Sequence, residues 1–295
     1  VLDDIAAVLD RERIARAVVV GSSYGSYLAS AFGVRHQDRV ERMLLDSPLQ
    51  STADLAIERE RVRGLFWNAG DRLSADVRAL VDRGEDARSV LDVVRAAYEL
   101  VGPELAEALA RRRLRRGLGL TWRVLSGYAT RDDDIAHIPG VYEFDTAGVI
   151  AFRELAYGAP LDGLPLDPAA TYAPLAARFP PFAGEPYDLP ALTPAFAWPL
   201  VVVSGARDLR TPPAIAERTV RTAQDGVIVT LENGHSALDT HPVALLNAVR
   251  RLVRGSQHRL PGEAALLDRL PRRGAGARVP DLLRALSRAE GLLGR

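Results

Sequence analysis

Residues 17–29, AVVVGSSYGSYLA, join a run of β-branched residues directly to a segment with an apolar helical face. The run AVVV at 17–20 has the composition of a buried strand, and residues 26–32 can continue as a helix. A sharp strand-to-helix turn must therefore lie between them. Gly21, Ser23 and Gly25 fit the pattern G-x-S-x-G in this turn. In that pattern small residues let the backbone bend tightly and hold the middle hydroxyl at the helix N-terminus.

Ser23 is therefore the candidate nucleophile, and Ser22 is interpreted as turn packing. The alternative for the same five residues is a simple Gly/Ser turn in front of a helix. A serine hydroxyl is a weak nucleophile without a base. A chemical role for Ser23 thus requires a histidine and a carboxylate elsewhere in the chain.

The alternation of helix and strand patterns predicts an α/β fold with a parallel sheet, because parallel strands need long, usually helical, crossovers. Strands are expected at 17–20, 42–46, 199–205 and 226–231, and helices at 2–16, 26–32, from near 211–213, and at 242–253. The first of these helices is expected to turn Ile5, Val8, Leu9 and Ile14 to one side.

Asp208 follows the third expected strand, and His235 follows the fourth. Loops after parallel strands gather at the carboxyl edge of a sheet, and Ser23 also follows a strand end. We therefore expect Ser23, Asp208 and His235 to converge in space.

Composition excludes several classes of function. The 295 residues carry 38 basic and 38 acidic side chains, so no net charge attracts nucleic acid or an anionic membrane. The absence of cysteine excludes disulfides and thiol catalysis. No apolar run approaches the ~20 residues needed to span a bilayer, and no dinucleotide or phosphate-loop motif occurs. We expect a globular, cytoplasmic protein without cofactor or metal, whose oligomeric state the sequence leaves open.

The three motifs together resemble the α/β-hydrolases, in particular the proline iminopeptidase and tripeptidyl aminopeptidase branch. The residues that carry the resemblance are VVVGSSYGSYLA, PLVVVSGARDLRTPP and LENGHSALDTHP. The resemblance implies that Ser23 is the acyl-accepting nucleophile, His235 the general base and Asp208 the residue that fixes the imidazole. The backbone N–H of Tyr24 would be one oxyanion donor.

The same resemblance divides the chain and indicates its activity. It implies a hydrolase core at 1–52 and 198–254, a mainly helical cap inserted at 53–197, and a tail with short helices at 255–295. The implied activity is an aminopeptidase that releases N-terminal residues from small peptides. Hydrolysis of a small ester by a carboxylesterase is the alternative, because the triad would be the same.

Family members have several strands before the nucleophile and an HGG-like loop that supplies a second oxyanion donor. Only 22 residues precede Ser23 here, and the chain has no such motif. Loss of one oxyanion donor costs about 100- to 1000-fold in turnover. We therefore expect an N-terminally truncated hydrolase fold, and a catalytically impaired remnant is a further alternative.

Glu154, in VIAFRELAYG, is the candidate substrate-binding residue. The segment resembles a cap stretch that binds the substrate's free amine in the aminopeptidase branch, and a carboxylate there would pair with an α-ammonium group. The alternative is an ordinary surface glutamate.

Other conspicuous side chains have plainer interpretations. His241 precedes Pro242 and suits a helix start, although it is the rival base. A solvated turn or helix cap is expected of Asp132, Asp133 and Asp134 near His137, and surface or packing roles of His36, His137 and His258.

Overall fold

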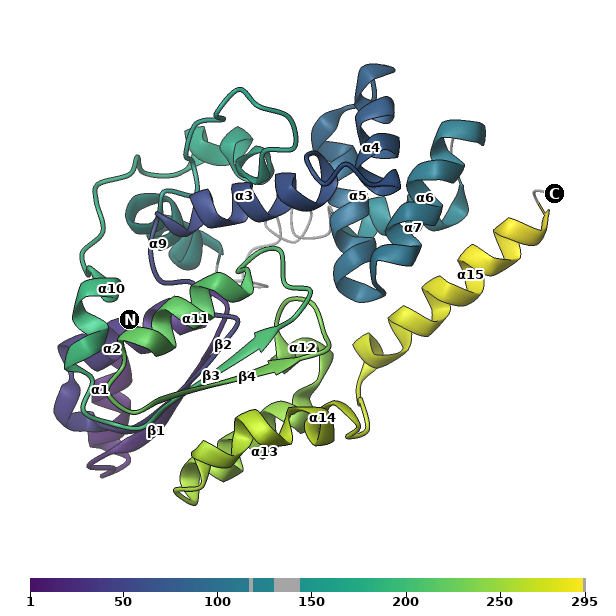
Figure 1. Cartoon of the computed structure of the whole chain (residues 1–295). Coiled ribbons are helices and arrows are strands. Elements are labelled where there is room, and N and C mark those ends of the chain that lie inside the picture. Colours follow the sequence, from purple (N-terminus) through teal and green to yellow (C-terminus); the bar gives the residue numbers. More distant parts are fainter. Residues whose placement is uncertain (117–118, 130–143, 294–295) are drawn as a thin grey trace. The chain divides into compact units, whose positions relative to one another are not determined.

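The computed structural model describes residues 1–116, 119–129 and 144–293 (Figure 1). The expected turn at 132–134 and His137 lie outside these residues. The chain divides into two compact units. The first consists of Val1–Asp54 and Tyr187–Ala277, and the second of Leu55–Pro186 and Arg278–Arg295.

The first unit is built on a sheet of four parallel strands in the order β1-β2-β3-β4. These strands are β1 Ala17–Ser22, β2 Val40–Asp46, β3 Leu200–Gly205 and β4 Gly226–Leu231. Ser22 pairs with Asp46 across β1 and β2, and Gly205 pairs with Leu231 across β3 and β4. Because all strands run the same way, the loops that follow them lie at one edge of the sheet.

Helices cover this sheet on both faces, because each strand is apolar on both sides. The helices of the first unit are α1 Leu2–Arg11, α2 Tyr24–Arg35, α10 Leu189–Leu192, α11 Pro213–Thr222, α12 Ala237–Thr240, α13 Pro242–Val253 and α14 Leu260–Asp268. Short 3-10 turns lie at Gln37–Arg39, Thr193–Ala195 and Gln257–Arg259.

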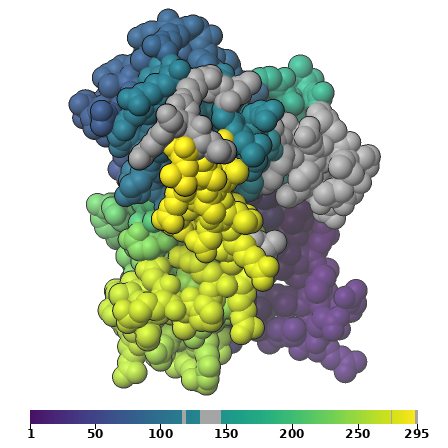
Figure 2. Space-filling view, turned by 90° about the vertical axis from the view of Figure 1, so that its right-hand side faces the viewer, coloured from purple at the N-terminus to yellow at the C-terminus, as the bar shows by residue number. Residues whose placement is uncertain are grey.

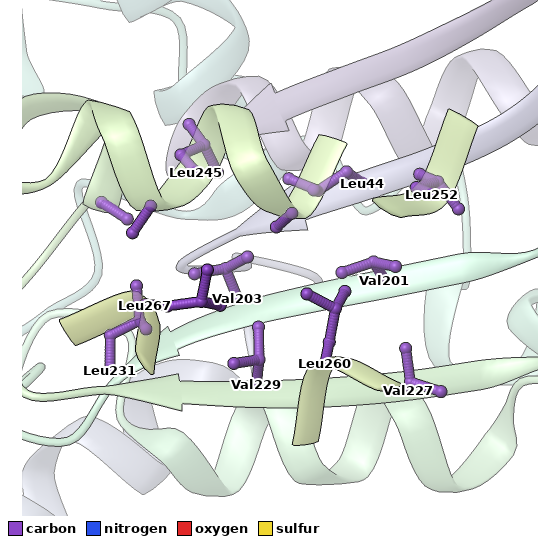
Figure 3. Close-up of a cluster of buried hydrophobic side chains, with 13 residues drawn as sticks. Leu44, Val201, Val203, Val227, Val229, Leu231, Leu245, Leu252, Leu260 and Leu267 are labelled. Carbon is purple, nitrogen blue, oxygen red and sulfur yellow. The ribbon is translucent and has the colours of Figure 1, made fainter. Parts of the chain in front are cut away.

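The side chains of β3 alternate between two hydrophobic clusters. Val201 and Val203 face α13 and α14, with Leu245 of α13 and Leu260 of α14 among the residues that pack on them (Figure 3). Leu200 and Val202 belong to the opposite cluster, in which α1, α2 and α11 contribute apolar residues. Burial on both faces explains why β3 reads as a continuous apolar run in the sequence.

The first helix differs from the prediction in length and in its buried face. It ends at Arg11 rather than Arg16, because Arg13 adopts a φ of 56° and the N–H of Ile14 turns back to the carbonyl of Leu9. Ala6 and Leu9 are buried, whereas Ile5 and Val8 are 37% and 47% exposed. The sequence contains two adjoining apolar stripes, and only the one that faces α2 is packed.

The second unit is mainly helical, and most of it is inserted between β2 and β3. Its helices are α3 Asp54–Phe66, α4 Arg72–Asp82, α5 Ala87–Leu100, α6 Pro103–Arg116, α7 Leu120–Ala129, α9 Phe144–Leu155 and α15 Val279–Leu293. Further 3-10 turns lie at Pro168–Thr171, Ala173–Arg178 and Ala275–Arg278. A parallel sheet with flanking helices and a helical insertion confirms the predicted fold class.

Side-chain caps and packed faces account for the helices of the second unit. Asp71 and Asp86 accept hydrogen bonds from the N–H groups of Ser74 and Ser89 and so cap α4 and α5. The helix α5 packs against α6 and α7. The C-terminal helix α15, drawn in yellow in Figure 2, packs against α6 and α7.

Candidate active site

Three loops at the carboxyl edge of the sheet bring Ser23, Asp208 and His235 together. Ser23 directly follows β1, Asp208 lies in the turn after β3, and His235 lies in the loop after β4. The Oγ of Ser23 is 2.7 Å from Nε2 of His235. Nδ1 of the same ring is 3.1 and 3.0 Å from the two carboxylate oxygens of Asp208. The expected convergence is therefore present as a continuous serine–imidazole–carboxylate chain.

The backbone at Ser23 adopts a conformation that L-residues rarely take. Its φ is 52° and its ψ is −122°, between the end of β1 and the start of α2 at Tyr24. The N–H of Ser23 donates to the carbonyl of Asp46 over 2.8 Å, and the Ser26 hydroxyl donates to the Ser23 carbonyl over 2.5 Å. Backbone strain of this kind persists only where the surroundings hold it, and it is common at active sites.

Gly21 is required where α2 returns over β1. A Cβ built at Gly21 would lie 2.3 Å from the carbonyl oxygen of Gly25 and 2.8 Å from Cβ of Ala29. A Cβ built at Gly25 meets nothing within 4 Å. The first glycine of the motif is thus dictated by close approach of strand and helix, and the second is not.

Asp208 is completely buried, and groups other than His235 also donate hydrogen bonds to it. Its carboxylate accepts hydrogen bonds from the N–H groups of Arg210 (3.0 Å) and Thr211 (2.9 Å), and from the Thr211 hydroxyl (2.9 Å). Burial by itself would raise the pKa of Asp208. The charge of His235 and hydrogen bonds from His235, Thr211 and Ser47 outweigh burial, so the pKa of this carboxyl lies below its ordinary value.

His235 links the buried acid to the half-buried serine. Its side chain is 14% exposed, while that of Asp208 is 0% exposed. Contact of Nδ1 with a carboxylate fits the tautomer that has its proton on Nδ1, and Nε2 is then an acceptor for the Ser23 hydroxyl. The imidazole can thus take a proton from the serine while the carboxylate stabilises the resulting cation.

Asp46 is a second buried carboxylate at this edge, and it is not among the side chains predicted from the sequence. It is the last residue of β2 and is completely buried. The Ser22 hydroxyl donates to it over 2.7 Å. In the sequence, Asp46 could have been recognised by its position at the end of a strand, because Asp208 and His235 also follow the ends of strands.

Tyr24 and Glu154 differ in how they relate to this site. Tyr24 is the first residue of α2, where backbone N–H groups point toward the helix N-terminus and favour negative charge. Glu154 belongs to α9 in the second unit, and its carboxylate accepts a hydrogen bond from Arg153 over 2.6 Å. The oxyanion role of Tyr24 and the amine-binding role of Glu154 stay predictions.

His241, the rival base, lies elsewhere in the first unit. It is completely buried directly before α13, and burial beside Arg272 lowers its pKa. Within 1–116, 119–129 and 144–293, no three His, Asp or Glu side chains are grouped to hold a metal ion. None of the helices in these ranges is both long and apolar enough for a membrane crossing.

Comparison with known proteins gave structural matches only. No family model matches the sequence, and no curated protein matches it. VinJ has 15% identity and a TM-score of 0.46, over 86% of this chain and 71% of VinJ. MGS-M2, an α/β hydrolase enzyme from a Medee basin deep-sea metagenome library, has 14% identity and a TM-score of 0.42, over 86% and 70% of the chains. A thermophilic esterase from Thermogutta terrifontis has 20% identity and a TM-score of 0.40, over 87% and 71%.

Proposed function

We propose that this chain is a serine hydrolase of the α/β-hydrolase class that acts by acyl transfer through Ser23, His235 and Asp208. The observation that carries the proposal is the unbroken contact from Ser23 Oγ through both ring nitrogens of His235 to the buried carboxylate. A serine in a simple Gly/Ser turn needs neither a base within hydrogen-bond distance nor a strained backbone. Ser23 has both.

The chemistry follows from these contacts in two steps. Ser23 Oγ bonds to the acyl carbon and gives its proton to Nε2 of His235, and the leaving group departs with that proton. Water then attacks the acyl-enzyme, gives a proton to the same nitrogen, and Ser23 regains its hydroxyl. The lowered pKa of Asp208 keeps the carboxylate ionised beside the imidazolium in both steps. The N–H of Tyr24, at the N-terminus of α2, is the proposed donor to the oxyanion.

A small carboxylic ester is the proposed substrate class. An alcohol leaves more readily than an amine, so ester hydrolysis makes the smaller demand on the oxyanion site. The aminopeptidase activity predicted from the sequence is the finer alternative. It requires Glu154 to exchange its contact with Arg153 for the ammonium group of a substrate.

Labelling with a fluorophosphonate, followed by peptide mapping, tests the proposal. We expect one adduct, at Ser23, and its loss in Ser23→Ala. The control is Ser89→Ala, an exposed serine whose hydroxyl bonds to Asp86 in the second unit, and this variant should label as the wild type does. Folded wild-type protein without an adduct at Ser23 would be a catalytically impaired remnant, and the proposal would be wrong.

Substrate comparison separates the two activities. Nitrophenyl esters of short acids are expected to be hydrolysed, and Glu154→Gln should hydrolyse them at the rate of the wild type. Aminoacyl anilides are then offered with free and with blocked amines. A preference for the free amine that disappears in Glu154→Gln would instead establish the aminopeptidase activity.

A further inference from the structure

The side chain of Asp46 contacts the last residue of β1, which precedes Ser23, and the first two residues of α12, which follow the loop that carries His235. Oδ2 accepts hydrogen bonds from the Ser22 hydroxyl (2.7 Å) and the N–H of Leu238 (3.0 Å). Oδ1 accepts from the N–H of Ala237 over 3.0 Å. Ser22 directly precedes the nucleophile, and Ala237 follows His235 by two residues. One buried carboxylate therefore joins the end of β1 to the start of α12, directly after the loop that carries His235 (residues 232–236, the histidine loop).

The neighbouring contacts extend this connection. The Ser22 hydroxyl also lies 3.1 Å from that of Ser236, and the N–H of Ser236 donates to the Ser47 hydroxyl over 3.0 Å. Ser47 and Ser236 have positive φ values of 50° and 61°. Conformations of this kind are strained and persist only when surrounding contacts impose them. The bonds to Asp46 and Ser47 are contacts that do so.

We propose that Asp46 is a positioning residue of the reaction, which holds the histidine loop against the nucleophile strand and so sets the distance between Ser23 Oγ and His235 Nε2. The inference rests on the proposed serine-hydrolase function. Asp46 does not touch either of the reacting side chains through a hydrogen bond in the structure. It acts through Ser22 on one side and through the backbone of Ala237 and Leu238 on the other.

A carboxylate is the group that these three donors require. Ionised aspartate offers acceptor sites on both oxygens and no donor, whereas the amide of asparagine offers one oxygen and an NH₂ group. With asparagine, the NH₂ would have to face either the N–H of Ala237 or that of Leu238. Burial raises the pKa of Asp46 above its ordinary value, although the bonds from Ser22, Leu238 and Ala237 and the charge of His235 act in the opposite direction.

The variant Asp46→Asn tests the role of the carboxylate, because it changes only the side chain of this residue. The backbone carbonyl of Asp46, which accepts the N–H of Ser23, is retained. We expect the rate of fluorophosphonate labelling at Ser23 and the kcat for a nitrophenyl ester to fall at least tenfold per labelled site, with KM little changed. Final labelling stoichiometry counts the folded sites, so a loss of folded protein does not imitate the effect.

Asp54→Asn is the matched control. Asp54 is also a buried aspartate of the first unit and accepts backbone N–H groups, from Gln50 (2.7 Å) and Ser51 (3.1 Å), with Arg218 as its ion-pair partner. It contacts neither Ser22 nor the histidine loop by any of these bonds. Its replacement should lower the free energy of unfolding and leave kcat per labelled site unchanged.

The outcomes distinguish this inference from the function on which it rests. If the wild type is not labelled, the proposed function is wrong. If the wild type is labelled and Asp46→Asn reacts as fast per site, the positioning role is wrong. If Asp46→Asn does not fold, Ser22→Ala decides, because it removes one donor to Asp46 without placing an NH₂ group against a backbone N–H. A several-fold lower rate in Ser22→Ala supports the role, and an unchanged rate overturns it.

Discussion

The two glycines that flank the proposed nucleophile should respond oppositely to a single added methyl group. In Gly21→Ala the new Cβ would start 2.3 Å from the carbonyl oxygen of Gly25 and 2.8 Å from Cβ of Ala29. Favourable carbon contacts lie at about 3.5–4.0 Å, so α2 must move away from β1 by on the order of 1 Å. Gly25→Ala meets no atom within 4 Å and replaces glycine in a helix by the best helix former.

The structure therefore gives both a sign and a magnitude for each change. Overpacking at Gly21 should lower the free energy of unfolding of the first unit by about 1–3 kcal/mol. Alanine at Gly25 should raise it, by up to about 1 kcal/mol. Ser23 lies in the turn between β1 and α2. A displacement of α2 by about 1 Å in Gly21→Ala should therefore also lower kcat for an ester roughly 100-fold.

Denaturant unfolding followed by Trp198 fluorescence measures these energies. The protein has three tryptophans, of which Trp198 packs in the first unit beside Phe196 and Met43. Replacing Trp67 and Trp122, which belong to the second unit, by phenylalanine leaves Trp198 to report on the sheet alone. If Gly21→Ala is as stable as the wild type while Gly25→Ala is destabilised, the close approach of β1 and α2 has been assigned to the wrong glycine.

Three further predictions concern ionised side chains. Asp208→Asn should lower kcat on the order of 10⁴-fold. In the wild type, ionised Asp208 contributes stability above pH 3.8, and this contribution should be lost as the pH falls through the lower pKa of Asp208 in the folded state. Urea unfolding midpoints measured at a series of pH values would show this loss. Asp162, bound to Arg63 by two contacts of 2.7 Å, has a pKa of about 2 instead of 3.8. Asp162→Asn should therefore lower the free energy of unfolding by up to about 1 kcal/mol at neutral pH. Below about pH 2, where Asp162 of the wild type is also protonated, the two proteins should be equally stable. Glu290→Gln weakens the contacts of α15 with Thr121 (2.9 and 2.6 Å), so amide exchange in α15 should accelerate while that in α13 does not.

The sequence alone predicted the strands and the three side chains of the proposed triad. Runs such as Leu200–Gly205 are apolar on both faces and too short for buried helices, so their assignment did not need the rest of the molecule. The G-x-S-x-G turn fixed Ser23, and the rule that parallel strands end at one edge placed Asp208 and His235 beside it. These inferences depend on local pattern and on the direction of strands, both of which are encoded along the chain.

Tertiary structure alone decided which of two apolar stripes on α1 is buried and that Asp46 lies beside the candidate site. Ile5 and Leu9 are equally apolar in sequence, and only packing on α2 distinguishes them. Asp46 faces Ser22 because of the register between β1 and β2, and it meets Ala237 because the histidine loop folds back over β2. Register and loop conformation arise from contacts between residues far apart in the chain, so no local pattern of charge or hydropathy reports them.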